Sequence, residues 1–254
     1  MKTLMICIAL FSLAPAGAYA EEHASGKEPH HPHWGYKGEA GPKHWGDLEH
    51  DFVACKLGTQ QSPVDIRKAQ DGQLPAIGFN YTVSAAEIVN NGHSIQVNVV
   101  DAGSVKLMSG DFKLVQFHFH APSEERIHGK SFPFNAHFVH RNEEGKLAVI
   151  AVLFKQSKED NPALARIFEA MPTEVGGKVE LKDGINPVDF FPSRQDYYAY
   201  TGSLTTPPCS EDVQWQVLKT PVPISRAQLK AFTKLYPMNA RPVQPLNGRV
   251  VKGS

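Results

Sequence analysis

Residues 116–140 decide the fold of this chain, and they read QFHFHAPSEERIHGKSFPFNAHFVH. Successive side chains of a β-strand point to opposite faces, so His118 and His120 share one face of a first strand. A turn separates this run from a second alternating run at residues 134–140, which can fold back beside the first and bring His137 to the same face. The pattern therefore predicts two neighbouring strands that carry three imidazoles on one side.

Three imidazoles on one face can hold a single metal ion. Zinc sites with three protein ligands leave the fourth tetrahedral position to water and are catalytic, whereas structural sites fill all four positions, usually with cysteine. Residues 116–140 contain no cysteine. We interpret His118, His120 and His137 as ligands of a catalytic zinc ion. The alternative is a set of half-buried polar residues without a metal, and His140, which has the opposite parity, is expected to be a packing residue.

Length and charge restrict the class of protein. With 254 residues the chain can bury one large core. Lysine plus arginine and aspartate plus glutamate both total 26, so no net basic field attracts nucleic acid or acidic lipid. We therefore expect a small-molecule partner and no nucleic acid.

Residues 1–20 have the form of a signal peptide. They begin with the basic Lys2, continue with an apolar run over residues 4–13, and end in the small-x-small sequence Ala18-Tyr19-Ala20. The apolar run is too short to span a bilayer, and no later stretch approaches about 20 apolar residues. We expect cleavage near Ala20, a periplasmic or secreted mature protein from a bacterium, and no membrane span.

Residues 21–33 are charged, contain four histidines and offer almost nothing apolar to bury. They are expected to form a flexible, His-rich tail before a single domain over residues 34–254. Of the three cysteines, Cys7 lies in the leader. Because exported proteins meet an oxidising environment, Cys55 and Cys209 are expected to form a disulfide, the alternative being two free buried thiols.

Short alternating segments dominate the rest of the chain and predict a mostly antiparallel sheet. Alternation is clear at residues 94–100 and 213–217, while the continuous apolar run at 147–154 predicts a central strand that is covered on both faces. Two peripheral helices are predicted, one beginning at Asn161-Pro162 and one after a capping box of Ser225 with Gln228.

Three further motifs accompany the histidines in a fixed order, namely QSP at 61–63, NNGH at 90–93 and SLTTPP at 203–208. Together they closely resemble the α-class carbonic anhydrases of the bacterial, exported type, and the resemblance extends over nearly the whole mature chain. It implies a mostly β (α+β) fold, with a central, largely antiparallel twisted sheet of about ten strands and short peripheral helices in a single domain. It also implies a Zn²⁺-dependent carbonate dehydratase, with weak esterase side activity, and suggests a homodimer.

The resemblance assigns roles to individual residues. A zinc-bound hydroxide would attack CO2 to give bicarbonate, Thr205 would orient that hydroxide and donate a hydrogen bond to Glu124, and His93 would be the proton shuttle. Histidine suits a shuttle because its unperturbed pKa is about 6.5. Gln116 would orient His118, and Asn135 would orient His137. The remaining assigned residues form a substrate wall of Val139, Val149, Leu204, Thr206, Val213 and Trp215, and a water chain of Tyr36, Asn91 and Gln96, the last replacing a usual Asn.

Asn135 is the main departure from the family pattern, which usually has Glu two residues before the third ligand. A neutral amide adds no negative charge there, so we expect somewhat weaker zinc binding and a somewhat more acidic bound water than in relatives with Glu. Glu125 is expected to be an exposed turn carboxylate.

Two other functions compete with the enzyme. A non-catalytic binding module on the same fold is one, because some relatives have lost activity, typically together with a zinc-ligand histidine. A periplasmic zinc store that uses the His-rich tail is the other, but no specific motif supports it. The presence of all three ligands, Thr205 and Glu124 favours the enzyme.

Overall fold

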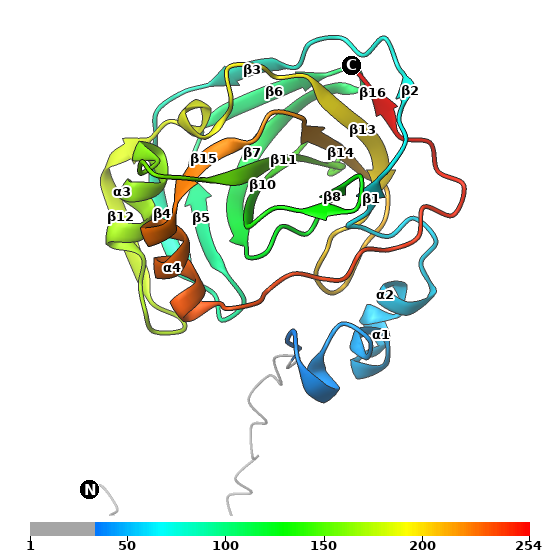
Figure 1. The fold of residues 1–254 in the computed structure, drawn as a ribbon, viewed down its shortest axis with the longest axis horizontal. Helices are drawn as coiled ribbons and strands as arrows, with labels where there is room; N and C mark the ends of the chain where they lie inside the picture. The colour runs from blue at the N-terminus through cyan, green and yellow to red at the C-terminus, as the bar shows by residue number, and fades with distance from the viewer. Residues whose placement is uncertain (1–33) are drawn as a thin grey trace, which may run out of the picture. The chain divides into compact units, whose positions relative to one another are not determined.

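A mixed sheet of thirteen strands forms the body of residues 34–254, the part of the chain that the computed structural model describes (Figure 1). The predicted signal peptide, its cleavage near Ala20 and the His-rich tail over 21–33 lie outside the described residues. The main path of the sheet is β12-β4-β5-β7-β10-β11-β14-β13-β16-β2, and β3, β6 and β15 pair beside it. The strands are β2 (Gln70–Asp71), β3 (Gly78–Tyr81), β4 (Ser84–Asn90), β5 (Ile95–Val99), β6 (Gly103–Leu107), β7 (Gly110–His120), β10 (Phe134–Arg141), β11 (Leu147–Ser157), β12 (Lys178–Ile185), β13 (Tyr197–Gly202), β14 (Val213–Leu218), β15 (Val222–Ser225) and β16 (Lys252–Gly253).

Most neighbours in this sheet are antiparallel. The parallel pairs within it are β11 with β14, β11 with β15, and β16 with β2. A second, three-stranded sheet consists of β1 (Asp65–Ile66), β8 (Arg126–Ile127) and β9 (Lys130–Ser131). The predicted mostly β fold with a largely antiparallel central sheet is confirmed, with ten strands on the main path and three more beside it.

The three strands at the centre are those that the sequence pattern predicts. β7 and β10 are antiparallel, with His118 directly opposite His137 and Phe117 opposite Phe138. β10 continues into β11, whose residues from Ala148 to Phe154 are all buried. The apolar run at 147–154 is therefore a central strand covered on both faces, as predicted.

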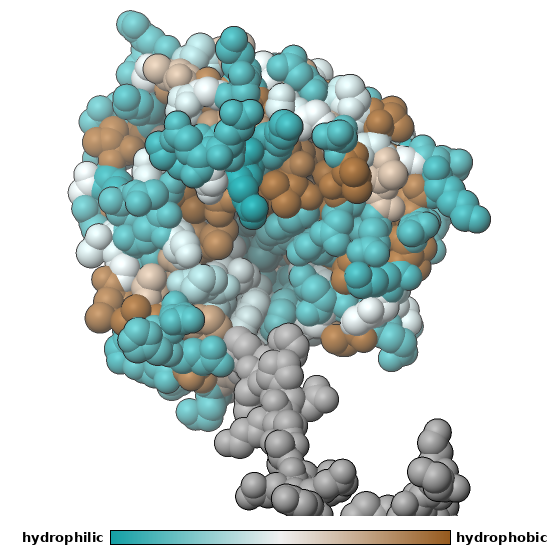
Figure 2. All heavy atoms as spheres, turned by 180° about the vertical axis from the view of Figure 1, so that it is seen from behind, coloured by the Kyte–Doolittle hydropathy of each residue, from teal (hydrophilic) through white to brown (hydrophobic). Residues whose placement is uncertain are grey.

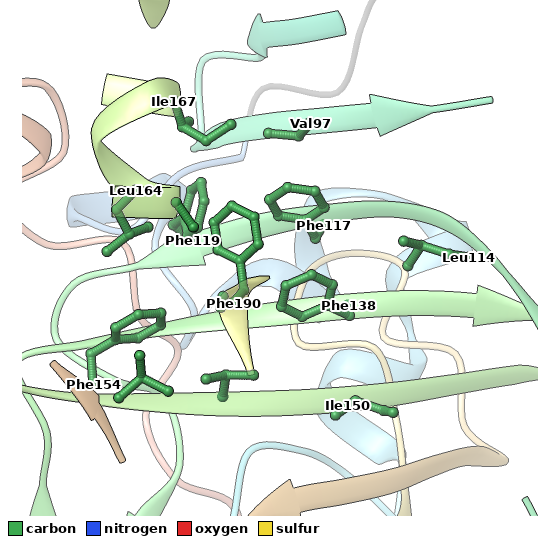
Figure 3. Packing of buried hydrophobic residues seen from close by; sticks show 14 of the residues in the cluster. Val97, Leu114, Phe117, Phe119, Phe138, Ile150, Phe154, Leu164, Ile167 and Phe190 are labelled. Atoms are coloured by element: carbon green, nitrogen blue, oxygen red, sulfur yellow. The ribbon is translucent and has the colours of Figure 1, made fainter. Parts of the chain in front are cut away.

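Alternation along β7 and β10 separates two environments. Phe117, Phe119 and Phe138 point away from the histidines into a large apolar cluster that also contains Phe190 and Leu164 (Figure 3). The rings of Phe117 and Phe138 stack with their centroids 4.7 Å apart. Burial of these rings holds the two strands in the one register that brings the imidazoles together on the opposite face.

The helices are short and peripheral. They are η1 (Gly38–Ala40), α1 (Trp45–Leu48), η2 (His50–Phe52), α2 (Ala54–Leu57), α3 (Pro162–Ala170), η3 (Pro187–Phe190) and α4 (Arg226–Leu235). Asn161 caps α3 by accepting from Leu164 N, and Ser225 with Gln228 forms the predicted capping box of α4. The two caps are joined, because Gln228 Nε2 donates to Asn161 O at 2.8 Å. In the described residues, no helix is long and apolar enough to cross a membrane.

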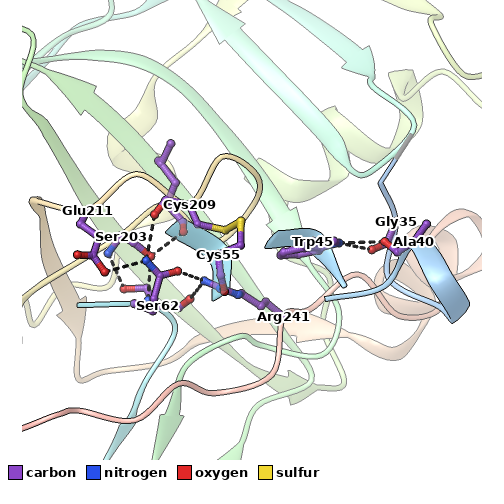
Figure 4. The surroundings of a disulfide bond; sticks show 11 residues. Gly35, Ala40, Trp45, Cys55, Ser62, Ser203, Cys209, Glu211 and Arg241 are labelled. Carbon is purple, nitrogen blue, oxygen red and sulfur yellow. Dashed lines mark hydrogen bonds between the residues drawn. A yellow bond between two sulfur atoms is a disulfide. The ribbon is translucent and has the colours of Figure 1, made fainter. Parts of the chain in front are cut away.

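The predicted disulfide between Cys55 and Cys209 is present, so the alternative of two free thiols is wrong (Figure 4). It links α2 to the loop before β14. Arg241 is buried beside it, donates to Cys55 O at 3.0 Å and to Ser62 O at 2.8 Å, and lies over the ring of Trp45. The N-terminal helices are thereby fixed to the body of the domain.

Candidate metal centre

Three imidazoles converge on the face of β7 and β10 that is opposite the phenylalanine cluster. One nitrogen from each of His118, His120 and His137 lies within 4.8 Å of the others. His120 and His137 are 1% exposed, and His118 is partly buried. The strand pairing that was predicted from the sequence thus brings these three residues together.

Each imidazole is oriented by a hydrogen bond to its outer nitrogen. His118 Nδ1 lies 2.9 Å from Gln116 Oε1, His120 Nδ1 lies 2.8 Å from Asn239 O, and His137 Nε2 lies 2.8 Å from Glu125 Oε1. All three partners are acceptors, so each outer nitrogen carries a proton, and in the neutral ring the inner nitrogen has the lone pair that can bind a metal.

The resulting set of donors fits zinc. The inner nitrogens are Nε2 of His118, Nε2 of His120 and Nδ1 of His137, and three neutral imidazoles with an open fourth position are typical of catalytic zinc sites. His120 Nε2 is buried and has no hydrogen-bond partner within residues 34–254. A buried polar atom without a partner requires an explanation, and a bound cation supplies one.

The imidazoles differ in how their surroundings affect protonation. Burial, with a smaller contribution from the charge of His137, lowers the pKa of His118 to about 3. Burial also lowers the pKa of His120 well below its usual value. For His137 burial alone would lower the pKa, but the charge of Glu125 and its hydrogen bond outweigh burial, so the pKa is raised. His118 and His120 are therefore neutral at pH 7, which is the form that binds metal.

Glu125 was missed by the sequence reasoning, and the expectation that it is an exposed turn carboxylate is wrong. Its side chain is fully buried, and Oε1 accepts from His137 while Oε2 accepts from Asn135 Nδ2 at 2.8 Å. The premise that no negative charge supports the third ligand is therefore wrong as well. Alternation could not identify Glu125, because it lies in the irregular loop between β7 and β8, where side chains follow no parity.

Asn239 was also missed. Its backbone oxygen orients His120, its Oδ1 accepts from Ala121 N at 2.8 Å, and its Nδ2 donates to His93 O at 3.0 Å. A contact made by a backbone carbonyl, from a residue that is remote in sequence, leaves no signal in the side-chain pattern.

Glu124 lies on the inner side of the ligands. Its Oε2 is 3.6 Å from His120 Nε2 and 3.8 Å from His137 Nδ1, and its Oε1 accepts from Arg241 N at 2.7 Å. Burial raises the pKa of Glu124 to about 7, against the lowering effects of His137, the Thr205 side chain and the Arg241 amide. A divalent cation held by the imidazoles would lower this pKa again and keep the carboxylate ionised.

Thr205 is held in place by the loop that carries it. Ser203 Oγ accepts from Ser62 N at 2.9 Å, and Ser203 N donates back to Ser62 Oγ at 3.1 Å. Gly202 is required here, since a Cβ at this position would come 2.1 Å from Ser62 Oγ. The reciprocal bonds fix the loop, and Thr205, which is 5% exposed, lies close enough to Glu124 to lower its pKa.

A cavity of about 270 Å³ opens onto His118 and His137. The predicted wall residues Val139, Val149, Leu204, Thr206 and Trp215 line it together with His118, His137 and Thr205. Val213 does not line the cavity but belongs to the apolar cluster behind it. The space-filling view shows a hollow on one face of the molecule, with hydrophobic residues on part of its rim (Figure 2).

The predicted shuttle and water-chain residues lie in and around the loop between β4 and β5. The ring of His93 stacks on Trp34, with centroids 3.7 Å apart and planes 8° apart. Asn91 Oδ1 accepts from His93 N at 2.9 Å, and Asn91 Nδ2 donates to Gln96 Oε1 at 3.3 Å. His93 and Tyr36 line a separate cavity of about 360 Å³ rather than the one that contains the ligands.

Comparisons with known proteins agree with this geometry. A family model described as eukaryotic-type carbonic anhydrase matches residues 40–254. The carbonic anhydrase of Neisseria gonorrhoeae is 44% identical over 252 residues, covering 98% of this chain and 97% of that protein. Among solved structures, α-carbonic anhydrase from Thermovibrio ammonificans in complex with the inhibitor sulfanilamide matches with a TM-score of 0.85 and 48% identity, covering 87% of this chain and 99% of that one. The α-carbonic anhydrase of Photobacterium profundum matches with a TM-score of 0.82 and 42% identity, covering 87% and 100%.

Proposed function

This chain belongs to the eukaryotic-type, or α-class, carbonic anhydrase family, and from that premise we propose that it is an exported, zinc-dependent carbonate dehydratase. It would convert CO2 and water into bicarbonate and a proton, and catalyse the reverse reaction. The observation that carries the proposal is the set of three converging imidazoles whose outer nitrogens are all hydrogen-bonded to acceptors.

His118, His120 and His137 would hold the metal. When bound, zinc supplies the Lewis acidity that makes water a nucleophile near neutral pH, a property for which carbonic anhydrases are the standard example. The other steps depend on residues of the chain.

Thr205 and Glu124 would orient the attacking oxygen. An ionised carboxylate only accepts hydrogen bonds, and Glu124 Oε2 has no partner at normal distance within the described residues. The Thr205 hydroxyl would donate to it, which leaves the Thr205 oxygen to accept from the nucleophile. An oxygen lone pair is then directed into the cavity, where CO2 would sit.

The apolar side of the cavity suits a substrate without charge or a permanent dipole. Val139 and Val149 face each other across β10 and β11, and Trp215 is fixed by donating Nε1 to Ser203 O at 3.0 Å. These residues offer CO2 contact area but few hydrogen bonds, so the more polar bicarbonate would be released readily.

His93 would carry the product proton to solvent, because an imidazole is ionised and neutral in comparable amounts near pH 7. Its stacking on Trp34 gives the ring a defined resting position, and transfer from the metal cavity would require intervening water molecules. Asn91, Gln96 and Tyr36 are the residues we assign to that path.

Stopped-flow CO2 hydration tests the proposal. We expect a fast rate that is lost on removal of zinc by a chelator and recovered when zinc is added back. His118→Ala is expected to lose zinc and activity together. A non-catalytic binding module or a zinc store would show no zinc-dependent hydration, and that result would disprove the enzyme.

A further inference from the structure

A buried carboxylate and a buried amide lie behind the third histidine. Glu125, from the loop after β7, and Asn135, on β10, are both fully buried, and His137 is 1% exposed. Glu125 Oε1 is 2.8 Å from His137 Nε2, and Glu125 Oε2 accepts from Asn135 Nδ2 at 2.8 Å. We propose that Glu125 is the positioning residue of the third ligand, so that a loop residue supplies the negative charge that the family pattern places on the strand at position 135.

The donors and acceptors allow one arrangement. Asn135 Nδ2 is 2.7 Å from His137 Nε2, but an amide nitrogen cannot accept a proton from the imidazole. The acceptor for His137 Nε2–H is therefore the carboxylate of Glu125. Asn135 serves Glu125, since its amide holds the second carboxylate oxygen, and its own Oδ1 has no partner in the described part of the chain.

The loop is built to keep Glu125 in this position. Ser123 Oγ donates to the backbone oxygen of Glu125 at 2.9 Å, and Arg126 N donates to Val64 O at 3.2 Å. Glu124 is bound on its other side by Arg241 N. The adjacent residues Glu124 and Glu125 consequently lie on opposite sides of one imidazole, with Glu124 near Nδ1 and Glu125 at Nε2.

The negative charge of the buried Glu125 carboxylate affects His137 electrostatically as well as by packing. Within residues 34–254, the ion pair of Glu125 is with His137, and no lysine or arginine forms one with it. A buried carboxylate needs a compensating positive charge. Zinc on Nδ1 supplies that charge through the imidazole ring, and the carboxylate in turn makes the ring a stronger donor to the metal.

The inference rests on the proposed zinc site but is tested by zinc binding alone. Partners that orient ligating histidines typically change metal affinity by about 10- to 100-fold when they are mutated. We expect Glu125→Gln to weaken zinc binding by such a factor in competition with a chelator and to speed zinc release. Glu144→Gln, which removes an exposed carboxylate in the β10–β11 hairpin, is the matched control and should leave both unchanged.

An isosteric exchange separates charge from packing. The double variant Glu125→Gln with Asn135→Asp keeps the same number of heavy atoms and moves the carboxylate to position 135, 2.7 Å from His137 Nε2. We expect it to recover most of the lost zinc affinity. A folded Glu125→Gln protein that binds zinc within about twofold of the wild type, or an exchange that recovers nothing, would overturn the proposal.

The wild-type protein offers a test that needs no variant to fold. In NMR spectra of the zinc-bound protein, the ring N–H of His137 should be further downfield than those of His118 and His120, because its acceptor is a carboxylate rather than an amide or backbone oxygen. A His137 signal at or upfield of the other two would contradict the assignment. Normal zinc binding without CO2 hydration would refute the proposed function and leave this inference standing.

Discussion

At the scale of single residues, two buried groups near the candidate centre each act in one protonation state. Thr205 is a neutral hydroxyl between a carboxylate and the cavity, and His140 is an imidazole on the apolar side of β10. Neither is a metal ligand. Their contributions can therefore be measured without changing the proposed metal ligands.

Thr205→Val should lower kcat/KM for CO2 hydration by about 100-fold, the typical loss when a reacting group is misplaced by about 1 Å. Valine has nearly the same shape but cannot relay a hydrogen bond to Glu124. Zinc content should stay at one ion per chain, as measured by atomic absorption. Thr205→Ser keeps the hydroxyl and should retain most of the activity; equal losses in both variants would refute the relay.

His140 should make stability depend on pH. Its side chain is fully buried, and burial lowers its pKa from 6.5 to about 4, while Tyr81 Oη lies 2.7 Å from its Nε2. The unfolded chain takes up this proton first as the pH falls through 6.5, so the stabilising contribution is lost between about pH 6.5 and pH 4. From pH 7 to pH 5 the loss should be about 2 kcal/mol.

Urea unfolding of the zinc-saturated protein at pH 7 and pH 5 measures this effect. The variant His140→Gln cannot titrate but can still bond Tyr81. Its free energy of unfolding should fall by about 2 kcal/mol less than that of the wild type over the same interval. An identical fall in both proteins would exclude His140 as the source.

At the scale of elements, regular alternation is what made the site predictable. β7 and β10 were predicted from side-chain alternation and β11 from its continuous apolar run, and the alternation also brought His118, His120 and His137 to one face. Alternation also places Gln116 on the face of His118, while its role as the partner of that ligand came from the family resemblance; the two side chains lie in hydrogen-bond contact.

Side-chain alternation did not reveal residues outside the regular strands or contacts between segments that are far apart in sequence. Glu125 is in a loop, and Asn239 acts through its backbone after a long separation in sequence. The parallel pairing of β14 with β11 was also not predicted, because the sequence shows that a strand exists but not which neighbour it joins. Because position 135 is Asn, the sequence predicted no negative charge beside His137. The carboxylate of Glu125, in the loop, lies there.

The linked caps of α3 and α4 lead to a prediction at this scale. Gln228→Ala removes the reciprocal half of the α4 capping box and both bonds to the backbone of Asn161. Because a lost cap costs about 1 kcal/mol and buried groups would be left unpaired, we expect a loss of about 2 to 3 kcal/mol in unfolding free energy. Gln244→Ala, at a partly exposed position, is the control and should cost less than about 0.5 kcal/mol in the same urea titration.

At the scale of the whole molecule, the Cys55–Cys209 disulfide closes a loop that contains most of the domain's residues. Cys209 lies in the same loop between β13 and β14 as Thr205. Cross-linking residues this far apart stabilises by up to about 5 kcal/mol in the chain-entropy model, and removal of native disulfides typically costs about 2 to 5 kcal/mol.

The double variant Cys55→Ser with Cys209→Ser should therefore unfold at a lower urea concentration by an amount in that range. If zinc affinity is measured below the unfolding transition, it should stay within a few-fold of the wild type, because the bond does not touch the ligands. A variant as stable as the wild type would show that the buried Arg241 contacts alone hold the N-terminal helices.

The edge formed by β2 and β16 joins two segments that are remote in sequence. β2 is joined to the main sheet through β16, with Gln70 paired to Lys252 and Asp71 to Gly253. The two partners lie far apart in sequence, and such long-range pairing is slow to form. We expect this edge to be among the last parts of the sheet to form, after β7, β10 and β11 have paired.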